Sequence, residues 1–366
     1  MAFSRKALYG HCFQILYPPR SRLRALPAAL LVALAALPLA GYAGNSGGYS
    51  PPGYGSWYVG DEGASNNTDV FYDGIPTTYI YVVGGYSDDS VNSADEVKGN
   101  VLTIDDTANS FIDAYGGYAR DNGNATATRN TVTINGGMID VVSGGYSYTE
   151  TSGGAVSAEN NEVIINDGSF FSPSVCGGCA KTQSAESASA TGNIVTINGG
   201  NFAALHAVFR GGYAHSESGE VSATDNTVTL RGGSFSDMGD NSVYGGYAFN
   251  SSSADATVTN NTVVLGRELE ANTLIYVALY GGYVGKYGTN GTGTENVSGN
   301  TLEVQGKGLK AKSIKNFDNY VFAASALSAV PALTLKRQYD ALDRRYQGEH
   351  RHQHPDHEGW RCGHAA

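Results

Sequence analysis

The residues of this chain whose spacing could most directly do chemistry are Cys176 and Cys179, which flank Gly177-Gly178. A Cys-x-x-Cys pair can form a local disulfide in an oxidising compartment, act as a redox dithiol, or persist as two free thiols. Redox dithiols of the thioredoxin type stand where a strand leads into a helix, and no helical pattern surrounds this pair. The sequence therefore disfavours redox catalysis. It leaves a local disulfide or two free thiols open, with the disulfide as the candidate site.

A histidine-rich segment near the end of the sequence is a second concentration of metal-binding residue types. Short His-rich tracts can bind zinc or nickel, but the His-x-His-x-His spacing here lies on no recognisable scaffold. A disordered tail, or a segment read in a shifted frame, explains the composition better, so we predict no metal site. The residues concerned are His350, His352, His354, His357, Cys362 and His364.

Residue types for other catalysis are few and scattered. Ser169 falls in a predicted corner of the chain, and His206 and His215 occur singly, without an evident nucleophile beside them in sequence. The protease motif Gly-Asp-Ser-Gly and the calcium-binding nonapeptide Gly-Gly-x-Gly-x-Asp do not occur. Polysaccharide lyases cluster acids and bases in a cleft, whereas the acids here are dispersed. We predict no enzyme, no catalytic residue and no cofactor.

Two short motifs alternate along the middle of the chain and must organise any site. An Asn-x-aliphatic-x-aliphatic pattern occurs seven times, and Gly-Gly-Tyr elements, with Gly177-Gly178-Cys179 as a variant, lie between its copies. The period is about 33 residues, and a fixed period of this size is typical of a solenoid. The first pattern begins at Asn100, Asn130, Asn161, Asn193, Asn226, Asn261 and Asn300. The second begins at Gly84, Gly116, Gly144, Gly211, Gly245 and Gly281.

Each repeat predicts short strands and no helix. In Asn226–Leu230 polar and apolar residues alternate, which is the pattern of a half-buried strand. A Gly-rich corner follows, then an aromatic residue such as Phe202 or Phe235, then a second strand ending at Gly-Gly-Tyr and a variable Ser/Ala/Thr/Glu-rich return. Stacked coils would pair these strands in parallel, with the Asn side chains in an amide ladder and the Tyr and Phe rings in stacks. The sequence therefore predicts a parallel β-helix of about seven coils.

The ends of the chain differ from the repeats in composition. Residues 1–43 have the features of a signal peptide, because five basic residues without an acid precede an apolar run that is shorter than the roughly 20 residues of a membrane span. Gly41-Tyr42-Ala43 then predicts cleavage between Ala43 and Gly44. We expect a flexible segment and N-terminal cap in residues 44–80, the β-helix in 81–322, and an atypical His-rich tail, disordered or frameshifted, in 323–366.

The charge of the predicted β-helix limits its partners. Residues 44–323 contain 12 Lys and Arg against 29 Asp and Glu. An acidic body of this kind disfavours binding to nucleic acid or to anionic membrane, since both present negative charge. It suits a soluble extracellular surface.

The repeats carry a resemblance to a known family. Gly192–Gly200, with the recurring Tyr-Gly-Gly-Tyr-Ala of Tyr115–Ala119 and Tyr244–Ala248, resembles the passenger regions of bacterial autotransporter adhesins of type V secretion. Ile314–Tyr320 is similar to the "NFxNY" stretch that closes many such passengers. The resemblance implies a right-handed parallel β-helix on the Gram-negative surface, anchored by a C-terminal β-barrel. Since such a barrel needs at least about eight strands, residues 323–366 are too few, and we expect a passenger without its translocator, from a truncated or frameshifted gene.

The function that the resemblance implies is adhesion. The expected protein is an exported, adhesin-like passenger at the cell surface or secreted, or periplasmic if no translocator exists. Its partner would be a glycan or protein on a host or bacterial surface, contacted by the variable segments after each Gly-Gly-Tyr on a rigid scaffold. The alternatives are a structural or self-associating solenoid and a polysaccharide-acting enzyme. The expected contact segments are Ser87–Val97, Arg120–Thr128, Ser147–Ala158, His215–Ala223 and Phe249–Val258.

Overall fold

The computed structural model describes the repeat region and short parts of its flanks. The described residues are 57–59, 65–72, 80–88, 96–105, 111–121, 123–149, 154–183, 186–202, 206–235, 240–269, 277–286, 293–323 and 331–335. The predicted signal peptide with its Ala43–Gly44 cleavage site lies outside them, and so does the histidine-rich tract. Every regular element in the described ranges is a strand, which confirms the all-β prediction.

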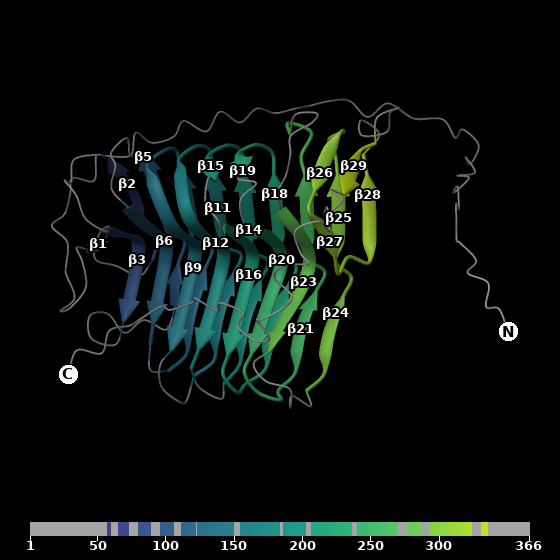
Figure 1. The fold of residues 1–366 in the computed structure, drawn as a ribbon. Helices are drawn as coiled ribbons and strands as arrows, with labels where there is room; N and C mark the ends of the chain where they lie inside the picture. Colours follow the sequence, from purple (N-terminus) through teal and green to yellow (C-terminus); the bar gives the residue numbers. More distant parts are fainter. Residues whose placement is uncertain are drawn as a thin grey trace, which may run out of the picture. The chain divides into compact units, whose positions relative to one another are not determined.

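The strands form three long sheets and one short one (Figure 1). Sheet A orders β1 (Trp57–Val59), β3 (Ile80–Asp88), β6 (Phe111–Arg120), β9 (Met138–Thr149), β12 (Ser169–Thr182), β16 (Val208–Ser216), β20 (Asn241–Asn250), β23 (Val277–Lys286) and β27 (Ser313–Lys315), while β15 (Asn201–Phe202) pairs with β12 and β19 (Ser234–Phe235) pairs with β15. Sheet B orders β24 (Glu295–Ser298), β21 (Ala256–Thr259), β17 (Val221–Thr224), β13 (Ala188–Thr191), β10 (Val156–Glu159), β7 (Ala125–Thr128) and β4 (Glu96–Lys98). Sheet C orders β2 (Thr68–Tyr72), β5 (Val101–Asp105), β8 (Thr131–Ile134), β11 (Glu162–Ile165), β14 (Ile194–Ile197), β18 (Thr227–Leu230), β22 (Thr262–Leu265), β25 (Thr301–Val304) and β28 (Asn319–Phe322). The short sheet pairs β26 (Leu309–Ala311) with β29 (Leu333–Leu335).

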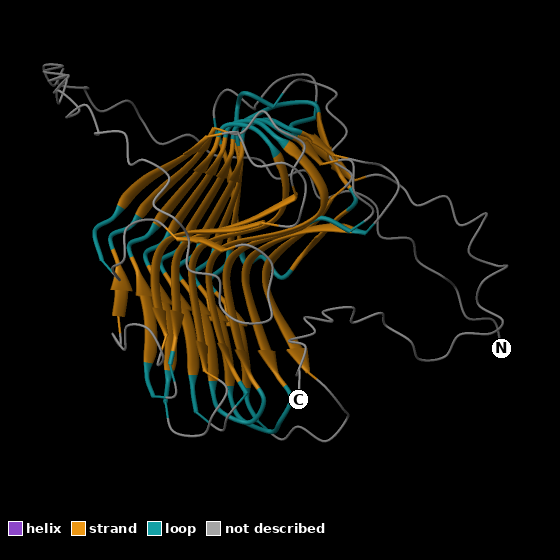
Figure 2. Cartoon of the chain, turned by 90° about the vertical axis from the view of Figure 1, so that its left-hand side faces the viewer, coloured by secondary structure: helices purple, strands orange, loops and turns teal. Residues whose placement is uncertain are grey.

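Each strand pairs in parallel with its counterpart one coil away, so the predicted β-solenoid is confirmed. In sheet C, for example, Val163 stands opposite Val132 on one side and Val195 on the other. The view along the coils shows the three sheets as separate faces of one winding chain (Figure 2). Parallel strands need a long crossover, and here the remainder of each coil supplies it.

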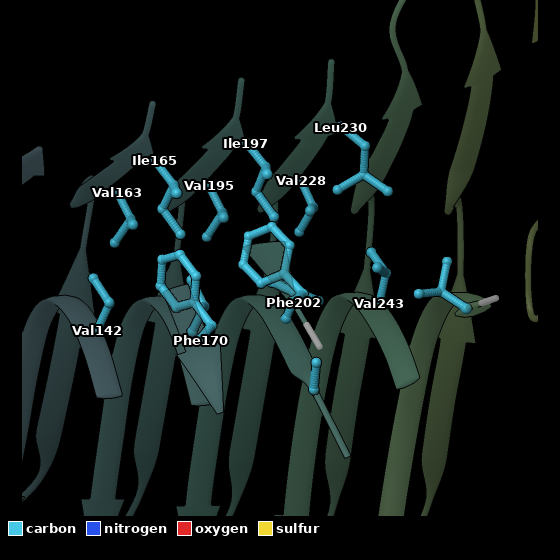
Figure 3. Close-up of a cluster of buried hydrophobic side chains, with 14 of the residues drawn as sticks. Val142, Val163, Ile165, Phe170, Val195, Ile197, Phe202, Val228, Leu230 and Val243 are labelled. Carbon is cyan, nitrogen blue, oxygen red and sulfur yellow. The ribbon is translucent and has the colours of Figure 1, made fainter. Parts of the chain in front are cut away.

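The larger core lies between sheets A and C and is built from the two predicted inward positions of each coil (Figure 3). Val195 and Ile197 are fully buried there, as are their equivalents in neighbouring coils. The predicted phenylalanine stack is confirmed, because the ring centre of Phe202 lies 4.5 Å from that of Phe170 and 5.1 Å from that of Phe235. Burying each such side chain stabilises the fold by about 1.5–3 kcal/mol, which supplies the main attraction between coils.

A smaller core of alanine and valine lies between sheet B and the far half of each sheet A strand. Two expectations are wrong here. The strands of sheet A do not end at Gly-Gly-Tyr but continue past it, as β16 does to Ser216. The segments expected to be contact loops each contain part of a strand of sheet B, such as Ala125–Thr128. Alternate residues of these strands are fully or almost fully buried, and their small side chains let the two sheets approach closely. Alanine has low strand propensity, so the sequence pattern concealed these strands.

The predicted asparagine ladder runs through the junction of the sheets and is confirmed in detail. The seven repeat asparagines are all fully buried. The Nδ2 of Asn161 donates to the Oδ1 of Asn193 at 3.0 Å, and that of Asn193 donates to Asn226 at 3.0 Å. From Asn130 onward, each Nδ2 also donates to a backbone carbonyl of the preceding coil, as Asn193 does to Ala158. Buried amides are thereby satisfied on every side, which a buried polar group requires.

The second glycine of each Gly-Gly pair packs directly against this ladder. A Cβ added at Gly145 would lie 2.5 Å from the Asn161 side chain, and the same close approach recurs at Gly117 and Gly212. The glycines therefore serve close packing in the middle of a strand, where a side chain would displace the asparagine row.

The residue before each ladder asparagine has a left-handed backbone. It is glycine or asparagine in most coils, but Arg129 occupies the position with φ 55°. Arginine pays a steric cost of about 1–2 kcal/mol in this conformation, while asparagine tolerates it. We therefore expect Arg129→Asn to raise the free energy of unfolding by about 0.5–1 kcal/mol in urea denaturation. Arg231→Asn, at an exposed corner without a left-handed φ, is the control, and an equal gain there would contradict this explanation.

Candidate interaction surface

The outer face of sheet A carries two rows of side chains that flank the Gly-Gly pairs. Around Gly177-Gly178, for example, Val175 belongs to the larger core and Ala180 to the smaller one. Because neighbouring residues of a strand face opposite sides, Cys176 and Cys179, which directly flank the glycines, face away from both cores. The first row consists of Val83, Tyr115, Ser143, Cys176, Arg210, Tyr244 and Tyr280. The second row consists of Tyr86, Tyr118, Tyr146, Cys179, Tyr213, Tyr247 and Tyr283.

The tyrosine rings stack along the rows, as the repeat predicted. Ring centres lie 5.1 Å apart for Tyr118 and Tyr146 and 5.2 Å apart for Tyr247 and Tyr283, with nearly parallel planes. Rings also meet across the glycines, where Tyr244 and Tyr247 have centres 5.1 Å apart. Such pairs are worth about 0.5–1.5 kcal/mol each beyond area burial. The rows therefore stabilise the stack and form a rigid aromatic layer in which some rings, such as Tyr213, are buried and others, such as Tyr247, are partly exposed.

Two tyrosines of the first row have raised pKa values. Burial, with the nearby Asp113 carboxylate and the neighbouring tyrosines, raises the pKa of Tyr115 well above 10. Burial also raises the pKa of Tyr244, although the Ser242 hydroxyl and Arg210 act in the opposite direction. These two phenols therefore keep their protons at ordinary pH and add no negative charge to the row.

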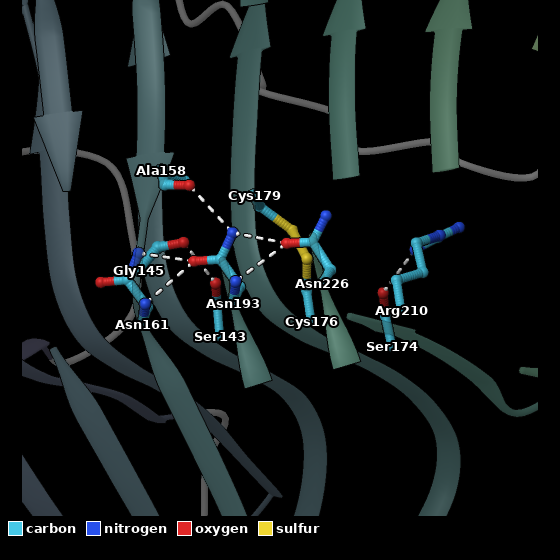
Figure 4. The surroundings of a disulfide bond; sticks show 10 residues. All are labelled: Ser143, Gly145, Ala158, Asn161, Ser174, Cys176, Cys179, Asn193, Arg210 and Asn226. Carbon is cyan, nitrogen blue, oxygen red and sulfur yellow. Dashed lines mark hydrogen bonds between the residues drawn. A yellow bond between two sulfur atoms is a disulfide. The ribbon is translucent and has the colours of Figure 1, made fainter. Parts of the chain in front are cut away.

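Cys176 and Cys179 occupy the two flanking positions in one coil, where Tyr115 and Tyr118 stand in another. Their sulfurs are joined by a disulfide bond, with Cα atoms 6.1 Å apart (Figure 4). Both residues are buried, and Tyr146 and Tyr213 pack against them. The disulfide thus connects the two rows across Gly177-Gly178 at the point where aromatic rings make that contact in other coils.

Cationic side chains lie against several of these rings, including Lys315, whose Nζ is 5.3 Å from the ring centre of Tyr280. The guanidinium carbon of Arg210 is 4.8 Å from the ring centre of Tyr213 and 5.1 Å from that of Tyr247, and its Nη1 donates to the Ser174 hydroxyl at 3.2 Å. Lys181 Nζ lies 6.0 Å from the ring centre of Tyr148.

His215 stands opposite Lys181 on the adjacent strand. Its ring meets Phe249 edge to face, with centres 4.9 Å apart. We call the surface formed by Tyr148, Lys181, Arg210, Tyr213, His215, Tyr247 and Phe249 the cation–aromatic patch.

The lysine of the patch is placed differently from two other lysines of the described surface. Lys98 and Lys286 lie beside carboxylates, at 2.6 Å from Glu96 and 2.9 Å from Glu295. Lys181 lies against an aromatic ring instead, as Lys315 does against Tyr280. Cation–π contacts are worth about 0.5–2 kcal/mol and leave the cation able to bind an anion. Although the solenoid as a whole is acidic, the patch is therefore a place where a negatively charged ligand can bind.

The candidate residues named from sequence fall in different places. Ser169 begins β12, His206 is exposed before β16, and only His215 joins the patch. Within the described ranges, no cluster of three His, Cys, Asp or Glu side chains is arranged to hold a metal ion.

Sequence reasoning missed Lys181 and Tyr148 as site residues. The available signal was their fixed position three residues after a Gly-Gly pair, which His215 and Phe249 share. Residues at this position lie side by side on adjacent strands only because sheet A continues past the glycines, which the sequence did not show.

Comparison with known proteins adds no further assignment. No protein-family profile, curated protein or solved structure matches the chain. The part of the chain that the structure describes has no helix of the length and apolarity needed to cross a bilayer.

Proposed function

We propose that this chain is an exported, adhesin-like protein in which the rigid β-solenoid presents the cation–aromatic patch to a ligand on another surface. The observation that carries the proposal is the placement of Lys181, Arg210 and the His215 imidazole among aromatic rings on an acidic solenoid. The resemblance of the repeats to autotransporter passengers supports the same function. On this proposal the protein acts at the cell surface or after secretion, or in the periplasm where no translocator accompanies it.

The ligand class that we propose is a glycan bearing carboxylates. Lys181, which is partly exposed, supplies a charge-assisted donor, which binds carboxylates more strongly than a neutral group does, and the buried Arg210 adds positive charge. The tyrosine hydroxyls and ring edges offer further contacts to sugar hydroxyls and CH groups. Lys181, Arg210 and His215 lie on two adjacent strands, β12 and β16, about 4.8 Å apart. That footprint suits a few sugar residues better than the roughly 800 Å² per partner of a standard protein interface.

Glycan binding by the full chain tests the proposal. We expect saturable binding to oligosaccharides containing sialic or uronic acid, weak binding to their neutral counterparts, and weakening by salt. The double variant Lys181→Ala/His215→Ala should bind at least about tenfold more weakly, because the lost charged contact of Lys181 alone is worth about 1.5–3 kcal/mol. Isothermal titration calorimetry measures both affinities.

The matched control is Lys98→Ala, which removes a lysine on sheet B without touching the patch. It should bind like the unchanged protein. An equal loss in the control, or no saturable binding to any acidic glycan, would count against the proposal. A structural, self-associating solenoid is the second candidate, favoured by the exposed apolar strand described next.

A further inference from the structure

The C-terminal end of sheet C exposes an apolar strand. β28 is the last strand in the order of that sheet, so one of its edges faces no other strand of sheet C. Tyr320, Val321 and Phe322 are exposed by 52%, 48% and 46%. Exposed apolar edges promote pairing with another chain, and proteins usually protect them with charges, proline or bulges. β28 contains Asn, Tyr, Val and Phe only.

The strand continues the core positions of the solenoid. Tyr320 stands opposite Leu302 and Phe322 opposite Val304, and both partners are fully buried. The neighbouring asparagine ladder is closed at this end, since the Asp318 carboxylate accepts from the backbone N–H of Asn300 at 3.2 Å. The polar row is therefore capped, while the apolar row beside it remains exposed.

The opposite end of sheet C differs. There Asp69 of β2 stands opposite Leu102, so a carboxylate residue type occupies a core register position. A charge in such a position disfavours edge pairing. Head-to-tail stacking, with β28 of one copy on β2 of the next, would bring Asp69 into the row of Tyr320. This arrangement disfavours fibre growth and favours pairing between two identical C-terminal ends.

We propose that β28 is a dimer interface in which two copies of this chain pair antiparallel across a two-fold axis. With Val321 on the axis, Tyr320 of each copy stands opposite Phe322 of the other. Aromatic cross-strand pairs of this kind stabilise antiparallel sheets. The same register places Asn319 opposite Ala323, so no like charges meet. The occupant is a second copy because the strand is self-complementary in this register.

Analytical ultracentrifugation of the full chain between about 1 and 100 µM tests the inference. The contact is small, so we expect a reversible monomer–dimer equilibrium in the micromolar range, typical of interfaces below about 1,200 Å². Val321→Lys puts two like charges on the axis and should raise the dissociation constant at least tenfold. Val101→Lys changes a valine that is 37% exposed on an interior strand, and it should leave the equilibrium unchanged.

A covalent test distinguishes the two-fold arrangement from other assemblies. Val321→Cys should form a disulfide-linked dimer under mild oxidation by oxidised glutathione, because the two sulfurs meet on the axis. Monomer at all concentrations, chains longer than dimers, or equal weakening by Val101→Lys would overturn the inference. Since the edge and the cation–aromatic patch are separate, Val321→Lys should keep full glycan binding, so failure of one proposal is distinguishable from failure of the other.

Discussion

Replacing Asn193 by alanine is expected to lower the free energy of unfolding by about 3–5 kcal/mol. The Oδ1 of Asn193 accepts from the backbone N–H and the Nδ2 of Asn161, and its own Nδ2 donates to Ala158 and Asn226. The substitution leaves two buried N–H groups of Asn161 without this acceptor, and each costs about 1–3 kcal/mol. Urea denaturation followed by circular dichroism measures the loss.

An exposed ladder in the same coils provides the control. Asn198 donates to Asn166 at 2.9 Å at the surface, where water can replace the lost contact. Asn198→Ala should therefore change stability by no more than about 0.5 kcal/mol. Equal effects of the two substitutions would show that burial of the inner ladder is not what makes it stabilising.

Substituting Gly144 by alanine is expected to cost more than about 3 kcal/mol and to reduce the yield of soluble protein sharply. An added Cβ would lie 2.5 Å from the carbonyl oxygen of Gly177 and 2.9 Å from both the N and the O of Glu162. These are backbone atoms of the next coil and of sheet C. They cannot rotate away as a side chain would, so the coils would have to separate. Soluble yield and thermal unfolding of any soluble fraction report the effect.

Gly123 offers a matched comparison. A Cβ there would have Asp121 Oδ1 at 3.7 Å as its nearest neighbour, which is ordinary van der Waals contact. Gly123→Ala should therefore express and unfold like the unchanged protein. If Gly144→Ala were equally benign, the close packing of the coils would not explain the recurring glycines.

The repeat period and the alternation in each copy were sufficient to predict the parallel solenoid and its asparagine ladder. They succeed because every coil places the same residue at the same register, so seven copies reinforce one weak local pattern. The Gly-Gly-Tyr elements were harder to interpret. Glycine inside a strand signals either a turn or a close approach of another group, and only the position of Asn161 beneath Gly145 decides between them.

Because the sequence did not decide whether Gly-Gly marks a turn or the interior of a strand, it also did not reveal the candidate surface. Treating Gly-Gly as the end of a strand put His215 at the start of an expected contact segment and left Lys181 outside all of them, so their alignment on adjacent strands was not visible. The disulfide pair could be proposed from spacing alone. Its position within two rows of tyrosines depends on which side of sheet A each flanking residue faces, and the bend at the glycines breaks the simple alternation of a strand.

The inner ladder also has a direction. Every side-chain amide donates toward the C-terminal end, from Asn100 to Asn130 and onward to Asn300. Aligned amide dipoles add along the row, as peptide dipoles do in a helix, and the positive pole falls where the Asp318 carboxylate lies. The last asparagine of such a row always has N–H donors that need an acceptor from the next coil. Aspartate can end the row because an ionised carboxylate accepts hydrogen bonds and has no N–H group to donate onward.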